Sequence, residues 1–232
     1  MRPFLTACCV LALGLAGCFG GSPQPRYYAL EPEAPARAPG GAYPFTLLVR
    51  RFETALAYDR SEIVYRPSEH ELRFYEYRLW IAKPGRMLSE VIATHLDALG
   101  LFQAVTTRST ERPAHYELRG EVLAIDEIDR MGKTGVAGER EQATQQWKAR
   151  LAMKLALSSL DSGEVVWAHA FETVRDVDRH DPHAVIEVLA AILDDELARM
   201  TAELDRTFAR ITGTPPRLEP AVTATPAAPD PP

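Results

Sequence analysis

The sequence predicts an α/β domain built on a mixed, largely antiparallel sheet that two main helices flank. In residues 116–122 and 147–157, apolar and polar side chains alternate with a period of two, which is typical of half-buried antiparallel strands. In residues 84–99 and 182–212, apolar side chains recur at helical spacing. Together these periodicities indicate one layer of sheet covered by helices.

The first strands come before the first helix. Residues 45–52 are rich in β-forming side chains, and residues 63–65 and 71–77 form two further runs of this kind. Pro84 opens the first helix, because a proline in the first turn loses no hydrogen bond there. Gly100 ends that helix, since glycine readily adopts the left-handed conformation of a C-cap.

The middle of the chain predicts a three-stranded antiparallel meander. Its strands are residues 116–122, 147–157 and 164–174. Residues 130–146 are polar and contain glycine, so we expect a long hairpin loop between the first two strands. Residues 161–163 (Asp-Ser-Gly) predict a tight turn into the third.

The last element is a long helix with clear end signals. Asp181 is a good N-cap, Pro182 follows it, and Gly213 stands just past the end. A helix of this length spans about 45 Å, more than a sheet of this size usually covers. We therefore expect one half of its apolar stripe to meet a second copy of the chain or another partner; packing on the domain's own core is the alternative. The residues of this expected interface are Leu197, Met200, Leu204, Phe208 and Ile211.

The N-terminus has the layout of a secretory signal peptide. Arg2 supplies a positive charge, residues 4–15 are almost entirely apolar, and small residues lead to Cys18. The apolar run is too short to span a bilayer. Leu-Ala-Gly-Cys at 15–18 resembles the lipobox of bacterial lipoproteins, in which the peptidase cuts before a cysteine whose thiol is acylated. We expect a palmitate-type lipid anchor at Cys18; a secreted protein with a chance cysteine is the alternative.

Composition sets the domain limits. Prolines and glycines gather in residues 18–43 and 213–232, so we expect a lipidated cysteine with a flexible tether, then a domain at 44–212, then a disordered Pro/Ala-rich tail. Residues 1–17 are the expected signal peptide. The net charge of −6 argues against nucleic acid as a partner.

Few residues suggest chemistry. Gly132-Lys133-Thr134 lacks the leading glycine of a phosphate-binding loop. His180 and His183 flank a helix cap, with no further ligands at a metal-binding spacing. Cleavage before Cys18 would leave no other cysteine for a disulfide, a metal site or a thiol nucleophile. We expect no catalytic, cofactor-binding or metal-binding residues.

One stretch resembles a known family. Tyr28-x-Leu30 is followed by Tyr58-Asp59-Arg60-Ser61-x-Ile63-Val64-Tyr65-Arg66, then by Glu71-Leu72-x-Phe74-Tyr75-x-Tyr77, Trp80 and Pro84, and by a helix that ends in Leu99-Gly100-Leu101-Phe102-x-x-Val105. This pattern resembles the ABC-type transport auxiliary lipoproteins, a family that includes the lipoprotein partners of MCE (mammalian cell entry) lipid-transport systems.

The resemblance implies a domain similar to the N-terminal domain of TolB and a non-enzymatic role. Its implied partners are an MCE-domain protein and an inner-membrane ABC permease and ATPase, with a lipid as an implied ligand. Phe19 stands where an aspartate would resemble an inner-membrane retention signal, so we expect the periplasmic leaflet of the outer membrane. The alternative is a structural or assembly lipoprotein of another envelope complex.

Overall fold

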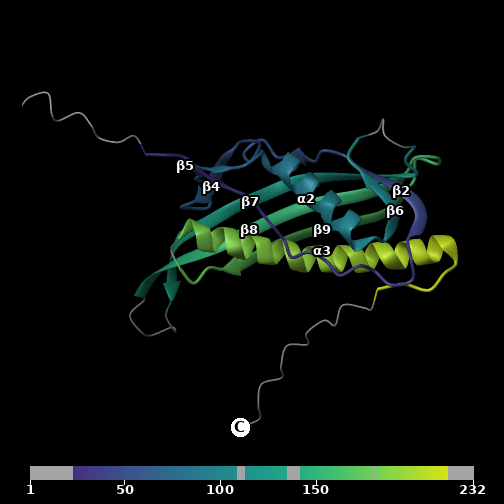
Figure 1. Cartoon of the computed structure of the whole chain (residues 1–232). Coiled ribbons are helices and arrows are strands. Elements are labelled where there is room, and N and C mark those ends of the chain that lie inside the picture. Colours follow the sequence, from purple (N-terminus) through teal and green to yellow (C-terminus); the bar gives the residue numbers. More distant parts are fainter. Residues whose placement is uncertain (1–22, 109–112, 135–141, 180, 219–232) are drawn as a thin grey trace, which may run out of the picture.

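The structure is a computed structural model that describes residues 23–108, 113–134, 142–179 and 181–218 (Figure 1). A mixed sheet and two helices form one domain, as the sequence predicts. In chain order the elements are β1 Arg26–Tyr28, β2 Tyr43–Val49, β3 Glu53–Thr54, β4 Glu62–Arg66, β5 Arg73–Trp80, α2 Pro84–Leu99, β6 Phe102–Thr106, β7 Tyr116–Thr134, β8 Gln142–Ser159, β9 Val165–Asp176 and α3 Pro182–Thr212.

Strand β7 lies at the centre of the sheet. One of its edges pairs in parallel with β2, then β3, then β4, at Tyr116–Leu118, Glu121–Val122 and Asp126–Ile128 respectively. Its other edge pairs antiparallel with β8, which pairs antiparallel with β9. Beyond β4 lie β5 and β1, and beyond β2 lies β6. The predicted meander is confirmed, and the parallel strands add a second half to the sheet.

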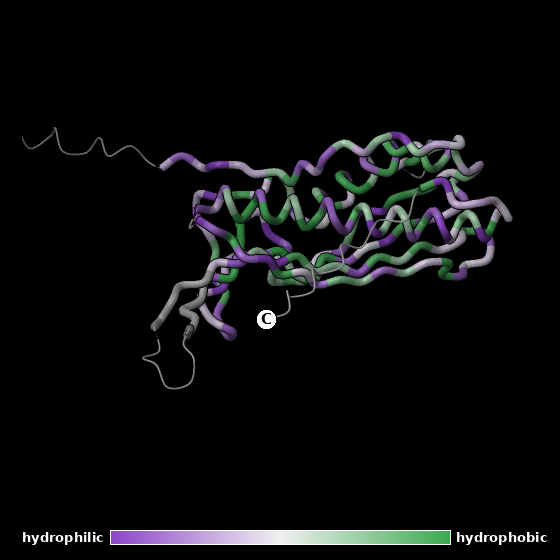
Figure 2. The backbone as a smooth tube through the Cα atoms, turned by 90° about the horizontal axis from the view of Figure 1, so that it is seen from below, coloured by the Kyte–Doolittle hydropathy of each residue, from purple (hydrophilic) through white to green (hydrophobic). Residues whose placement is uncertain are grey.

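Both helices pack on the same face of the sheet. Ile92 of α2 and Leu193 of α3 line one small internal cavity together with Met153 of β8. Along both helices in Figure 2 the colour alternates between hydrophobic and hydrophilic, as expected where only one side is buried. Gly85 lets α2 approach the β2–β3 connection, because a Cβ there would stand 2.3 Å from the carbonyl oxygen of Phe52.

The predicted helix ends are confirmed. The Asp181 carboxylate accepts a hydrogen bond of 3.2 Å from the backbone N–H of His183. Gly100 and Gly213 adopt the left-handed conformation at the two C-caps, with φ of 66° and 67°. Each of these capping residues acts on its own neighbours in sequence, so tertiary packing does not change where the helices end.

Two predictions about loops are wrong. The expected hairpin loop at 130–146 is mostly strand, since the β7–β8 ladder continues to the pair Thr134 and Gln142. The expected tether is instead part of the folded domain from Arg26 onwards. Strand β1 pairs in parallel with β5, and Leu30 is buried with 1% of its surface exposed.

The expectation that half of α3 projects beyond the sheet is also wrong. Strands β7 and β8 contain 19 and 18 residues, so at about 3.3 Å per residue the sheet is at least as long as the helix. Figure 1 shows α3 lying along it. Of the five residues expected to form an interface, Leu197, Met200, Leu204 and Phe208 are core residues that expose 2% or less. Ile211 alone stays exposed, at 44%.

Phe208 shows why this half of the helix is buried. Its ring lies 4.8 Å from that of Phe102 in β6 and 4.9 Å from that of Tyr116 in β7, both edge-on. Tyr43 and Phe45 of β2 complete the cluster, each with its ring centroid 5.6 Å away. Aromatic pairs at such distances stabilise a core beyond the area they bury.

The first residues of the expected disordered tail are also packed. The buried carboxylate of Asp205 accepts hydrogen bonds from the backbone N–H groups of Arg217 and Leu218, at 2.6 and 2.7 Å, and from the Tyr43 hydroxyl at 2.7 Å. The Arg217 guanidinium lies over the Tyr43 ring at 3.7 Å. Burial and then the hydrogen bond to Asp205 raise the pKa of Tyr43 to about 12. Residues 219–232 of the tail lie outside the described residues.

A buried polar cluster joins β4 to β7 and β8. The fully buried Asp126 carboxylate accepts hydrogen bonds from Tyr58 at 2.6 Å, from Arg66 at 2.7 Å and from Arg150 at 2.7 and 2.9 Å. Both guanidinium groups also donate to the Tyr58 hydroxyl, at 2.9 Å. Burial and then the bond to Asp126 raise the pKa of Tyr58, which stays a neutral donor. Tyr58 and Arg66 bound the motif that carries the family resemblance, so its ends serve the core.

We predict that the tail contributes to stability only as far as Leu218. A chain that ends at Thr212 loses both backbone donors to Asp205 and leaves part of a buried carboxylate unpaired, at about 1–2 kcal/mol. Its melting temperature should fall by about 5 °C, whereas a chain that ends at Leu218 should melt like the full protein. Equal melting of the two truncated chains in circular dichroism would contradict the packing of residues 213–218.

We also predict that Asp126→Asn is severely destabilising. The substitution keeps the shape but leaves two mostly buried arginines without their anion, and breaking a buried ion pair costs about 3–5 kcal/mol. Asp59→Asn is the matched control in the same motif, because the Asp59–Lys83 pair is exposed, with an N–O distance of 3.3 Å, and such pairs contribute about 1 kcal/mol or less. Urea unfolding measures both, and similar losses would refute the role given to Asp126.

Candidate functional site

An apolar groove lies between the N-terminal segment and helix α2. It encloses about 420 Å³, and α2 contributes the side chains Met87, Val91, Thr94, His95 and Ala98, at helical spacing. The opposite wall is the segment 29–35, and Ile81 and Ala82, which follow β5, complete the lining. Apolar concave surfaces with a few polar groups are the usual form of small-molecule sites.

Three contacts hold the N-terminal wall of the groove in place. Leu30 is buried in the hydrophobic core. The backbone N–H of Glu33 donates to the Asp194 carboxylate of α3 at 2.8 Å. The backbone N–H of Ala38 donates to the carbonyl oxygen of Leu99, also at 2.8 Å. One wall of the groove is therefore a helix, and the other is a non-helical segment that these separate contacts hold in place.

The polar groups of the groove are acidic or neutral. Glu31, Glu33 and Glu90 line it, and its lining contains no lysine or arginine. Burial lowers the pKa of His95, against a weaker opposing effect of Asp194, so the imidazole is uncharged at neutral pH. Its buried Nδ1 has no hydrogen-bond partner among the described residues. The groove suits a hydrophobic molecule whose polar end is uncharged or cationic, and it disfavours an anionic one.

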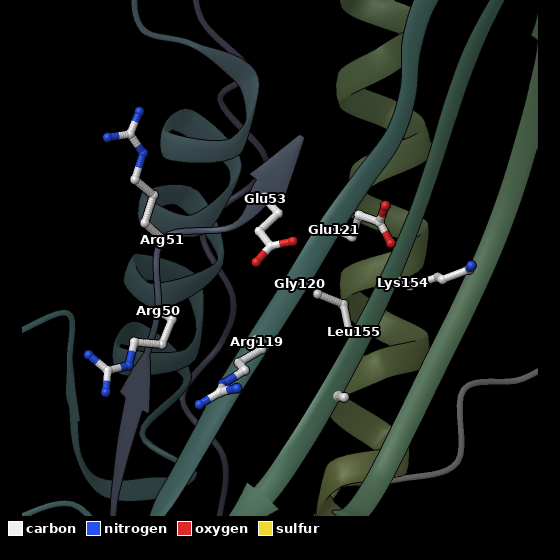
Figure 3. Close-up of a pocket in the computed structure, with 9 residues that line it drawn as sticks. Arg50, Arg51, Glu53, Arg119, Gly120, Glu121, Lys154 and Leu155 are labelled. Carbon is white, nitrogen blue, oxygen red and sulfur yellow. The ribbon is translucent and has the colours of Figure 1, made fainter. Parts of the chain in front are cut away.

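A second depression lies on the opposite face of the sheet (Figure 3). It encloses about 460 Å³ and is floored by the small residues Gly120 and Ala156. Figure 3 shows Arg50 and Arg119 toward one end and the carboxylates of Glu53 and Glu121 toward the other. Because charges of both signs surround the open floor, the depression does not favour any one class of ligand, and we assign no site here.

Glu117, which pairs with two arginines that line this depression, is a structural carboxylate. It exposes 2% of its surface and pairs with Arg50 and with Arg119, the latter at 2.6 Å. Burial opposes its ionisation, but the hydrogen bonds from the two arginines outweigh this and lower its pKa. The carboxylate is fully occupied and unsuited to general-base chemistry at neutral pH.

Glu196 and Glu203 of α3 flank His169 of β9. The His169 Nε2 lies 3.3 Å from Glu196 and its Nδ1 lies 3.1 Å from Glu203. Trp167 also donates to Glu203, and Thr173 to Glu196, so the carboxylates tie the helix to the strand. Among the residues that the structure describes, no group of three histidine, cysteine, aspartate or glutamate side chains is arranged to hold a metal.

The candidate sites predicted from the sequence differ from the one that the structure shows. Cys18, the expected lipidation site, lies outside the described residues. The expected interface on α3 is core, as described above. The groove was missed, because its outer wall was taken for a tether. Two features of the sequence could have indicated the groove. Residues 29–35 contain four alanines and prolines, and the apolar stripe of α2 that faces them continues to Ala98. Within the described ranges, no helix combines the length and the apolar character that a membrane span requires.

Solved structures share this fold. A Xanthomonas campestris protein of the family called DUF330 superposes with a TM-score of 0.64 at 19% identity, over 82% of this chain and 100% of that one. An uncharacterised protein superposes with a TM-score of 0.58 at 15% identity, over 78% and 99% of the two chains. At these identities the likeness concerns the fold alone. No curated protein matches the sequence.

The family is identified by the sequence itself. The family model described as 'ABC-type transport auxiliary lipoprotein component' matches residues 28–201, from the end of β1 into α3. This range includes the cluster around Asp126 and every described member of the aromatic cluster except Phe208. The description is of lipoproteins that assist transport, which associates the family with the cell envelope. The chain belongs to the ABC-type transport auxiliary lipoprotein component family.

Proposed function

We propose that this chain is a non-enzymatic, membrane-anchored periplasmic lipoprotein that serves an ABC/MCE-type system for moving lipids or other hydrophobic molecules. The observation that carries the proposal is the apolar groove against α2, in a chain of a transport-auxiliary family. A groove that shelters acyl carbons from water removes about 0.8 kcal/mol of cost per methylene. The partners would be an MCE-domain protein and an inner-membrane permease and ATPase.

The anchor in this proposal is Cys18. Two or more acyl chains on its thiol and amino group hold a protein on a membrane stably, where one chain does so only marginally. Phe19 follows Cys18, which favours the periplasmic leaflet of the outer membrane. The domain would then face the periplasm, where an MCE-domain protein from the inner membrane can reach it.

The partners are tested by crosslinking in intact cells, followed by mass spectrometry of the chain purified under denaturing conditions. We expect crosslinked peptides from an MCE-domain protein, a permease or an ATPase of a lipid-transport system. Crosslinks confined to components of another envelope machine would favour an assembly role and contradict transport.

Cys18→Ser is the control for that experiment. Without the thiol, acylation and cleavage should both fail, so the uncleaved precursor should lose at least tenfold of its transport-partner crosslinks. A sucrose gradient should place the unaltered chain with outer-membrane markers. Cofractionation of the unaltered chain with inner-membrane markers would refute the proposed location, and full acylation of Cys18→Ser would refute the anchor.

The groove is tested by the substitution Ala98→Trp. The indole should fill the end of the groove and displace at least two methylenes of a bound chain, which corresponds to about 1.6 kcal/mol, or roughly tenfold in affinity. Titration with a pyrene-labelled monoacylglycerol, which is uncharged, measures the loss. Because of the three groove carboxylates, a pyrene-labelled fatty acid anion should bind more weakly than the glyceride.

Asp97→Trp is the matched control, since Asp97 is the exposed neighbour of Ala98 on α2 and does not line the groove. It should bind the glyceride like the unaltered protein. Equal affinities for Ala98→Trp and Asp97→Trp would show that the label binds elsewhere.

A further inference from the structure

Large apolar side chains are exposed at one corner of the sheet. Tyr27 of edge strand β1 is 61% exposed, Tyr77 of β5 is 43% exposed, and Ile81, just after β5, is 66% exposed. In the parallel β1–β5 pairing Tyr27 lies opposite Leu79. Tyr77 stands two residues from Leu79 on the adjacent strand, so Tyr27 and Tyr77 lie at the same part of the sheet edge. We call Tyr27, Tyr77 and Ile81 the aromatic corner.

The aromatic corner has the composition of a membrane–water interface. Tyrosine places an apolar ring among acyl chains and its hydroxyl among headgroups, and it is enriched at that depth in membrane proteins.

The area of the corner favours a lipid surface over a second copy of the chain. Three side chains exposed to these fractions present on the order of 350 Å². Each partner in a stable protein complex buries about 800 Å². Insertion of a few side chains into a membrane has no such minimum, because the covalent anchor supplies most of the attachment.

The length of chain before β1 places a membrane within reach. Arg26 follows Cys18 by eight residues, and a chain of that length spans at most about 29 Å. Leu160, another exposed apolar side chain, lies at the far end of the sheet. It follows the Tyr116–Ser159 end of the β7–β8 ladder, whereas β4, the neighbour of β5, pairs with β7 near Asp126. Those two positions on β7 are separated by about 33 Å.

We propose that the aromatic corner lies in the lipid–water interface of the membrane that holds Cys18. This inference rests on the acyl anchor in the proposed function. It sets the orientation of the domain, with the β1–β5 edge on the bilayer and the β8–β9 turn pointing away. Ile81 also lines the apolar groove, so the groove reaches the bilayer at Ile81, and a lipid enters it there without crossing water.

The test uses the full mature chain, whose only native cysteine is acylated and therefore has no free thiol. Tyr77→Cys introduces a single thiol for a nitroxide label. Leu160→Cys is the matched control, because Leu160 is 45% exposed. Both proteins are placed in vesicles of phosphatidylethanolamine and phosphatidylglycerol. Electron paramagnetic resonance then measures relaxation by oxygen, which concentrates in lipid, against a nickel chelate, which stays in water.

We expect an oxygen-to-nickel ratio at position 77 at least fivefold above that at position 160. Equal ratios would overturn the inference, as would strong spin–spin coupling between copies at position 77, which would show a second chain there. Should Tyr77→Cys fail to fold, Ile81→Cys gives the same test at a position outside the strand. Intact mass decides the anchor separately: an unacylated chain overturns the anchor and the orientation together, while an acylated chain with a water-exposed label overturns the orientation alone.

Discussion

The shared edge of β7 is the constraint on which the rest of the structure depends. Along that edge β2, β3 and β4 each pair in parallel with a short part of one strand, so three separate segments are fixed in order by a single ladder. The antiparallel β8 secures the other edge over almost the full length of β7. Parallel strands need long connections. Helix α2 lies in the connection from β5 to β6, and α3 lies along the same face of the sheet.

The groove and the aromatic corner follow from that arrangement. Because β4 pairs near Asp126, β5 and β1 extend the sheet outward at that end, and the chain before β1 leaves the domain there. The segment after β1 must then cross α2 to reach β2, and it forms the outer wall of the groove on the way. The corner and the groove are thus adjacent, and Ile81 belongs to both.

Local signals predicted the elements, and distant contacts decided what sequence reasoning missed. The helix at 182–212 was predicted to the residue, because Asp181, Pro182 and Gly213 act on their own neighbours. The segment around Leu30 was mistaken for a tether, since its proline content excludes regular structure but not burial. The carboxylate of Asp205 and the parallel pairing of β6 depend on residues far along the chain, which periodicity alone does not reveal. The groove was missed for the same reason.

The claim that joins these features is that the groove carries a lipid taken from the membrane beneath it. Native mass spectrometry of the acylated protein, released from the envelope in mild detergent, tests it most directly. We predict one bound lipid per chain in the unaltered protein, with a neutral or amine-bearing polar end, and little or none in Ala98→Trp. A chain that leaves the envelope without lipid, or one whose lipid persists in Ala98→Trp, would contradict it.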